Sequence, residues 1–261
     1  MNRKTSISIL FSLAVLIVGV GAITAIMYWP DNGTPAPDSE IKGARTTSRL
    51  ETMLEYLTAQ VSGLKQVERN LRLAQPLLDP ATSATADTRL HWMSNSRLEL
   101  LNLRAKAQAF TVPEEARAAH EAYLTTLDVF IRMYEHQSTA LTAEQNKDDQ
   151  SQFSFVDANR AYEEGQAALG NSKIQNGEAL RAAGAKFSDT DGDALPDVWE
   201  HIAGSDITLV DTDEDGLSDG EEFNHFLTKP NLPDTDADGF LDGVEVSSGY
   251  NPLGEGLLLK E

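Results

Sequence analysis

The stretch DTDEDGLSDGEE, Asp211–Glu222, places four aspartates and three glutamates in twelve residues without one positive charge. The same register recurs without a gap as DTDGDALPDVWE at 189–200 and as DTDADGFLDGVE at 234–245. Each copy has Asp at positions 1, 3, 5 and 9, an apolar residue at position 7 and Glu at position 12. A disordered acidic run has no reason to keep a fixed apolar position, so the pattern indicates three folded loops.

Positions 1, 3, 5, 7, 9 and 12 are those that supply oxygen ligands in a calcium loop of the EF-hand type. Short carboxylates at alternate positions point inward, position 7 offers its backbone carbonyl, and the longer Glu reaches back with both oxygens. We therefore expect about three Ca²⁺ ions, one in each loop. The candidate ligands are Asp189, Asp191, Asp193, Leu195, Asp197 and Glu200 in the first loop, Asp211, Asp213, Asp215, Leu217, Asp219 and Glu222 in the second, and Asp234, Asp236, Asp238, Phe240, Asp242 and Glu245 in the third.

Position 6 of such a loop makes a sharp turn that favours glycine, because it has a positive φ. Gly216 and Gly239 satisfy this requirement, whereas the first loop has Ala194 there and is expected to bind more weakly. The apolar side chains at position 7 are free to pack, since only their carbonyl is needed.

Other metals and catalysis fit the loops less well. The chain has no cysteine, and no histidine lies inside a loop, which disfavours zinc and copper. Magnesium prefers a strict octahedron that keeps its waters. Paired carboxylates also serve as acid–base catalysts, but three equivalent tandem copies argue against an active site. The chain has no Ser-His-Asp pattern, phosphate-binding glycine loop or nucleotide fingerprint, so we predict that it is not an enzyme.

The loops begin 22 and 23 residues apart, which leaves too little chain between them for paired helix–loop–helix units. Related linkers at 204–210, 227–233 and 249–255 share the underlying pattern G-[TS]-[DN]-P-x-x-P, from which Ile207, Val210, Leu227, Lys229, Tyr250 and Glu255 depart. In loop and linker the chain resembles the bacterial thrombospondin type 3 repeat over about residues 188–254. The resemblance implies stacked loops that hold calcium and act as stiffened spacers or surface modules, and it implies no enzymatic activity.

The excess charge lies almost entirely in this repeat region. Residues 187–261 contain 13 Asp and 7 Glu against 2 Lys, a net charge of −18 out of −20 for the whole chain. Such self-repulsion predicts that the metal-free repeats are largely unfolded. It also argues against nucleic acid as a partner, because phosphates would be repelled.

The N-terminal residues predict a membrane anchor. Residues 7–29 carry no charge and follow Arg3 and Lys4, which predicts a transmembrane signal-anchor with residues 1–6 in the cytoplasm and the body in the periplasm or outside the cell. The alternative is a signal peptide cleaved after Val20-Gly21-Ala22. Residues 30–40 are rich in Pro, Gly and Asp and are expected to form a linker.

Residues 41–186 predict a domain of helices. Apolar residues at helical spacing indicate helices over about 50–74, ended by Pro76 and Pro80, then 88–110, a third opened by a capping box at 111–114, and 153–183. Four helices with short connections favour an antiparallel four-helix bundle. The first and third could instead form a coiled coil with a protein partner or a second copy.

The sequence thus predicts a mostly α fold in six parts: 1–6, the anchor 7–29, the linker 30–40, the bundle 41–186, three calcium repeats over 187–254, and a tail 255–261. Two functions remain open. One is a membrane-anchored, exported protein whose calcium-stiffened module serves structure, adhesion or scaffolding. The other is an extracytoplasmic sensor that binds a small ligand in the bundle and signals through a partner.

Overall fold

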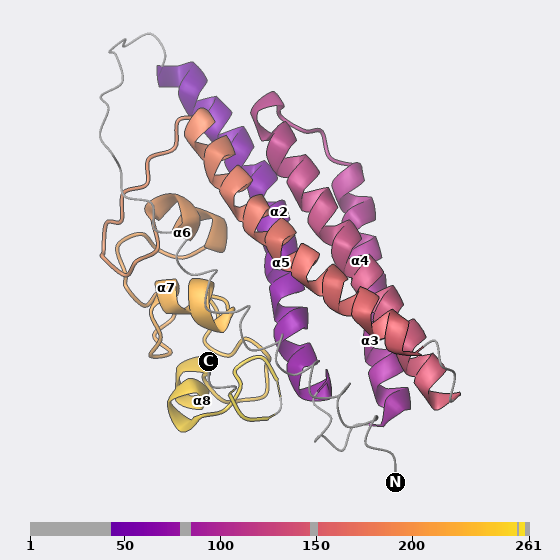
Figure 1. Ribbon diagram of the computed structural model, residues 1–261. Helices are drawn as coiled ribbons and strands as arrows, with labels where there is room; N and C mark the ends of the chain where they lie inside the picture. The colour runs from indigo at the N-terminus through magenta and orange to yellow at the C-terminus, as the bar shows by residue number, and fades with distance from the viewer. Residues whose placement is uncertain (1–42, 79–84, 147–150, 255, 259–261) are drawn as a thin grey trace.

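The computed structural model describes residues 43–78, 85–146, 151–254 and 256–258. The fold is mostly helical, as expected. Four long helices, α2 (Gly43–Leu78), α3 (Ala86–Gln108), α4 (Arg117–Gln145) and α5 (Ser151–Ala182), lie side by side and alternate in direction (Figure 1). We call these four helices the bundle.

The predicted membrane anchor needs correction. Residues 7–29 lie outside the described residues. Within the described ranges, no helix combines the length and the apolar character needed to cross a bilayer. Charged residues recur along all four long helices. The predictions of a transmembrane helix in the fold and of a single-pass membrane location are therefore wrong for the structure as described.

The helix boundaries differ from the prediction at both ends of α2, which begins at Gly43 rather than near residue 50, and at the start of α4. Helix α2 continues through Pro76 to Leu78, past the expected stop. The capping box expected at 111–114 does not form. A 3₁₀ turn, η2 (Glu114–Ala116), comes first and α4 begins only after it, because the residue before Pro113 disfavours helical geometry and Pro113 itself is extended, with ψ 147°.

The bundle core is built from apolar faces of all four helices. Large side chains such as Tyr123, Phe130 and Tyr134 are fully buried in it, and Trp92 packs edge-on against Tyr134 with ring centroids 5.6 Å apart. These aromatic residues thus serve packing. The buried members of this core are Leu64, Val67, Met93, Leu100, Ala107, Tyr123, Leu127, Phe130, Ile131, Met133, Tyr134, Leu141, Ala161 and Leu169.

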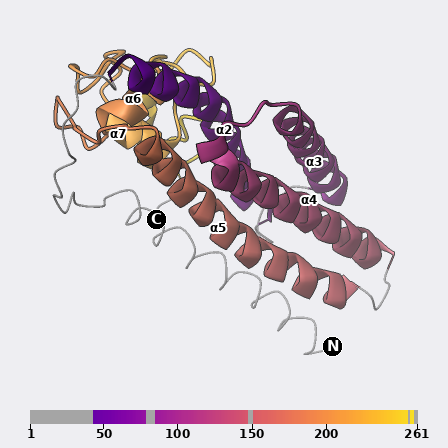
Figure 2. The same cartoon turned by 90° about the horizontal axis from the view of Figure 1, so that it is seen from above.

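The three acidic loops follow the bundle, and short helices lead out of them: α6 (Asp197–Ala203) from the first, α7 (Asp219–Glu221) with η3 (Glu222–Phe226) from the second, and α8 (Asp242–Ser248) from the third. These helices lie in series along one side of the bundle, next to α2, as the orange-to-yellow segments in Figures 1 and 2 show. The repeat region is therefore folded back along the bundle.

A second hydrophobic core joins the repeats to the bundle. Leu195, Trp199 and Phe223 of the first two repeats pack in one cluster with bundle residues. From the bundle and the residues that flank its helices, the buried members are Met53, Tyr56, Leu57, Val61, Ala116, Ala119, Ala179, Leu180 and Ala183. We call this cluster the shared core. Because both regions contribute to it, folding of the repeats and stability of the bundle are linked.

Candidate metal centre

Each acidic loop is shaped by the same backbone hydrogen bonds. In the second loop the amide of Gly216 donates to the Asp211 carboxylate at 3.1 Å. The amide of Asp215 donates to Asp213 at 3.3 Å, and that of Leu217 donates to Asp215 at 2.8 Å. The first and third loops repeat all three bonds, with distances between 2.7 and 3.2 Å. The aspartates at positions 1, 3 and 5 therefore organise the turn and face its interior.

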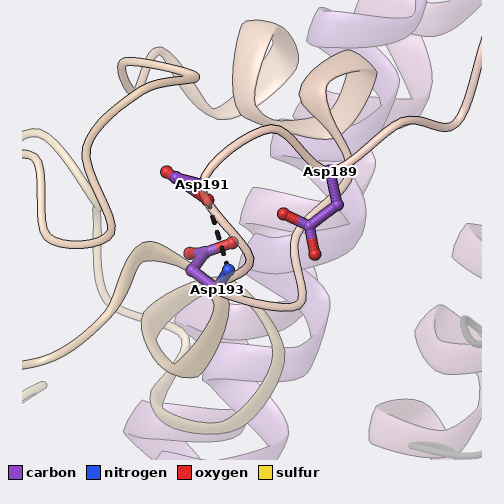
Figure 3. A group of neighbouring side chains, drawn as sticks. All are labelled: Asp189, Asp191 and Asp193. Carbon is purple, nitrogen blue, oxygen red and sulfur yellow. Dashed lines mark hydrogen bonds between the residues drawn. The ribbon is translucent and has the colours of Figure 1, made fainter.

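These bonds bring three like charges together in every loop. Carboxylate oxygens of positions 1, 3 and 5 lie within 4.8 Å of one another in the groups Asp189–Asp191–Asp193, Asp211–Asp213–Asp215 and Asp234–Asp236–Asp238. Figure 3 shows the first group around one turn of the chain, with the amide of Asp193 bonded to Asp191. Burial, and after it the charges of the neighbouring aspartates, raises the pKa of Asp213 to about 6. Three clustered carboxylates fit the oxygen preference of a hard divalent cation.

The glutamate at position 12 lies inside the structure in all three repeats. Glu200, Glu222 and Glu245 are buried, and each has at least one side-chain oxygen without a hydrogen-bond partner. Burial and nearby aspartates raise the pKa of Glu200 and Glu245 to about 7, and burial raises that of Glu222 to about 9. A buried carboxylate normally has a charged or hydrogen-bonded partner. These orphaned oxygens fit a site that a cation completes.

The aspartate at position 9 has a role that the ligand pattern did not predict. It accepts a hydrogen bond from the amide of the threonine at position 2, for example Thr212 to Asp219 at 2.9 Å. The equivalent bonds join Thr190 to Asp197 at 2.8 Å and Thr235 to Asp242 at 2.9 Å. The recurring threonine in DTD was the signal for this contact in the sequence.

Positive φ occurs at two positions of each loop. Ala194 adopts φ 74°, so the first loop makes the same turn as Gly216 and Gly239 despite its side chain. The residue at position 4 also has positive φ. That residue is Gly192 in the first loop but Glu214 and Ala237 in the others, at 61° and 63°. Each loop thus contains at least one non-glycine residue in the left-handed region.

The apolar residue at position 7 packs only in the first two loops. Leu195 and Leu217 are buried, whereas the Phe240 side chain is 61% exposed. The freedom to pack that the sequence predicted for position 7 is thus used in two of the three loops. Leu195 reaches the shared core, and Phe240 lies outside both hydrophobic cores.

Successive loops contact each other through a glycine at position 10, which the sequence reasoning missed. The amide of Gly220 donates to Asp193 of the preceding loop at 2.6 Å, and that of Gly243 donates to Asp215 at 3.0 Å. A Cβ on either glycine would lie 2.3 or 2.4 Å from the preceding loop's backbone carbonyl oxygen. The first loop, which no other loop precedes, has Val198 at position 10. The presence of glycine at this position in the second and third loops alone was therefore a signal of the contact in the sequence.

Basic side chains of α2 bind the end of the second repeat. Lys65 donates to the carbonyl of Phe223, and Arg69 and Arg72 donate to the carbonyls of Leu227 and Phe226 at 2.8 and 3.1 Å. These carbonyls lie at the C-terminal end of η3, where cations are favourable. Nothing in the sequence pattern connected these α2 residues to the repeats.

A family model described as the bacterial TSP3 repeat matches residues 211–225 and 234–253. The match lies on the second and third loops and agrees with the resemblance predicted from the sequence. The first loop, 189–200, lies outside the matched residues but has the same hydrogen bonds. No curated protein and no solved structure significantly matches the chain.

Proposed function

We propose that this protein is a structural calcium-binding protein in which each acidic loop holds one Ca²⁺, about three in all. TSP3 repeats bind calcium and are structural modules, which supports calcium as the ion and a non-enzymatic role. The clustered carboxylates of the loops supply the oxygen ligands that calcium prefers.

One observation carries the proposal. The three loops share one hydrogen-bond framework, and within it the position-12 glutamates are buried with oxygens that no donor reaches. Folding that buries such carboxylates beside other carboxylates is unfavourable unless a cation binds there. A divalent ion at each loop removes this penalty.

The loop geometry supports the following set of ligands. The carboxylates at positions 1, 3 and 5, the carbonyl at position 7 and the glutamate at position 12 surround each ion. The aspartate at position 9 closes the loop through its threonine. In the first two loops the position-7 side chains are then free to pack, which links ion binding to the packing of Leu195 in the shared core.

The proposed role is that of a calcium-stiffened scaffold. With calcium bound, the repeat region stays rigid and packed along α2. Without calcium, the repulsion within the repeats opposes this packing. Partners, or a second copy of the chain, would be recruited through the helical domain. The alternative of a small-ligand sensor gains no support from the bundle, whose described interior is filled by Tyr123, Phe130 and Tyr134.

A calcium titration of the full chain by calorimetry tests this function, with magnesium as the control ion. We expect saturable binding of about three Ca²⁺, a gain of helical circular dichroism and little response to magnesium. Failure to bind calcium at millimolar concentration, a range that weak extracellular modules reach, would rule the function out.

A further inference from the structure

The junction between the second and third loops contains a group of carboxylates that crosses from one repeat to the next. Oxygens of Asp215, Glu222 and Asp242 lie within 4.8 Å of one another, and all three residues are buried. Asp215 and Glu222 belong to the second loop, whereas Asp242 is position 9 of the third. Three carboxyl groups therefore meet in a site that neither loop forms alone.

Two oxygens in this group are left without partners. Oε2 of Glu222 and Oδ2 of Asp242 are buried, and neither has a hydrogen-bond partner. The other oxygens are used: Oε1 of Glu222 accepts from the Thr228 hydroxyl at 2.9 Å, and Oδ1 of Asp242 accepts from the amide of Thr235 at 2.9 Å. The two free oxygens are those available to a cation.

One cationic side chain of α2 acts on this group. Arg69 interacts electrostatically with Asp242, and its guanidinium donates to the carbonyl of Leu227. The Asp215 carboxylate also connects the two loops. One of its oxygens accepts a hydrogen bond from the amide of Leu217 in its own loop, and the other accepts one from the amide of Gly243 in the next loop.

We propose that Asp242 is a ligand of the calcium ion in the second loop, supplied from the third loop, so that one ion is shared by two successive repeats. This inference rests on the proposed function and adds a ligand from outside the loop. It implies that the second loop reaches full affinity only when the third loop is folded beside it.

The first junction does not offer the same ligand. There the equivalent aspartate, Asp219, uses both oxygens to accept from Thr212, at 2.9 Å from the amide and 2.6 Å from the hydroxyl. The close contact of the loops is present, through Gly220 and Asp193, but no oxygen of Asp219 is free. The shared site is therefore assigned to the second junction alone.

Substitution of Asp242 by Asn tests the proposal in the full-length chain. The Asn side chain keeps the oxygen that accepts from Thr235 and removes the charge. The amides of Gly216 and Gly239 each donate to the first aspartate of their own loop, so their NMR resonances report the second and third loops separately during a calcium titration. We expect Asp242→Asn to raise the calcium midpoint of Gly216 by about tenfold or more.

The matched control is Asp197→Asn, which makes the same change at position 9 of the first loop, where no loop precedes. It should leave the Gly216 midpoint within about twofold of wild type. A Gly216 midpoint that stays unchanged in Asp242→Asn, while Gly239 shifts, overturns the shared ligand but leaves calcium binding intact. A wild-type protein in which neither glycine responds to calcium refutes the proposed function itself.

Resonances of the buried Tyr123 and Phe130 confirm that the bundle is folded in each variant. If the Asp242→Asn variant loses these resonances, the Asp242→Glu variant is tested in its place. The Glu side chain keeps the negative charge but moves it outward by one methylene, and the proposal again requires a raised calcium midpoint at Gly216.

Discussion

The rings of Trp199 and Phe223 lie with their centroids 6.2 Å apart, and both belong to the shared core. Trp199 precedes the position-12 glutamate of the first loop, and Phe223 follows that of the second. The pair therefore joins the exits of two acidic loops on the surface of α2. If these loops bind calcium as proposed, a change in the metal state of either one should alter this contact.

Replacement of Phe223 by Ala should destabilise the whole protein. It removes a buried ring that contacts Trp199 and lies under the Lys65 ammonium, which is 3.8 Å from the ring centroid. We expect a loss of about 3–5 kcal/mol in the free energy of unfolding, measured by urea denaturation of the calcium-loaded protein. Phe240→Ala is the control, since that side chain is mostly exposed and should change stability by less than about 0.5 kcal/mol. Equal effects of the two variants would contradict the shared core.

Replacement of Glu222 by Gln should have opposite effects with and without metal. It removes the proposed position-12 ligand of the second loop, so calcium affinity should fall by about tenfold or more. It also removes a buried carboxyl group whose ionisation is opposed by burial, so the metal-free protein should melt at a higher temperature. Calorimetry and thermal denaturation measure the two effects. Glu214→Gln is the control, because it removes a carboxylate from an exposed position of the same loop. It should change neither the calcium affinity nor the melting temperature of the metal-free protein.

Replacement of Ala194 by Gly should improve the first loop. Ala194 has a φ of 74°, which costs a residue with a side chain roughly 1–2 kcal/mol. Glycine avoids this cost, but about half of the gain is lost because glycine is more flexible in the unfolded chain. We expect tighter calcium binding at this loop, read from Trp199 fluorescence. The converse change, Gly216→Ala, should weaken the second loop. Weaker binding by Ala194→Gly would mean that the loop changes its turn when the ion enters.

Stability without metal should fall as the pH rises. The pKa values of Glu200 and Glu245 in the folded protein are about 7 and that of Glu222 is about 9, against about 4.3 in an unfolded chain. Between these values the folded state binds more protons, so the free energy of unfolding decreases with increasing pH. Thermal denaturation of the metal-free protein should therefore give a higher midpoint at pH 5 than at pH 8.

Calcium should reverse this dependence. As a ligand set for the ion, the carboxylates must lose their protons, so calcium affinity should increase with pH. The melting temperature at saturating calcium should consequently be at least as high at pH 8 as at pH 5. The same downward trend with and without calcium would show that these glutamates are not ligands.

Replacement of Gly243 by Ala should separate the second loop from the third. The added Cβ would lie 2.4 Å from the carbonyl oxygen of Asp215, so one of the two loops has to move. We expect the free energy of unfolding of the calcium-loaded protein, measured by urea denaturation, to decrease by about 1–3 kcal/mol. Gly177→Ala on α5 is the control, because its Cβ meets open space and alanine favours the helix. Stability unchanged by Gly243→Ala would contradict the close packing of the loops.

The sequence predicted the features that depend on local spacing. The aspartates converge as expected because their positions within twelve residues determine the turn. The burial of Leu195 and the exposure of Phe240 could not be told apart, since both occupy position 7 and only contact with α2 distinguishes them. The contacts of Lys65 with Phe223 could not be predicted for the same reason. They join segments that are far apart in the chain, and a single sequence contains no pattern that reports such contacts.

The contacts between α2 and the repeats, both apolar and basic, also have a mechanical consequence. The repeats lie along α2, and their contacts with it follow one another in the same direction, from Met53 and Leu57 through Lys65 to Arg69 and Arg72. A force parallel to α2 loads these contacts together in shear. A force that lifts the last repeat away from α2 breaks these contacts one after another, beginning at the C-terminal side. The protein should therefore resist tension along the bundle far better than peeling from its C-terminal side.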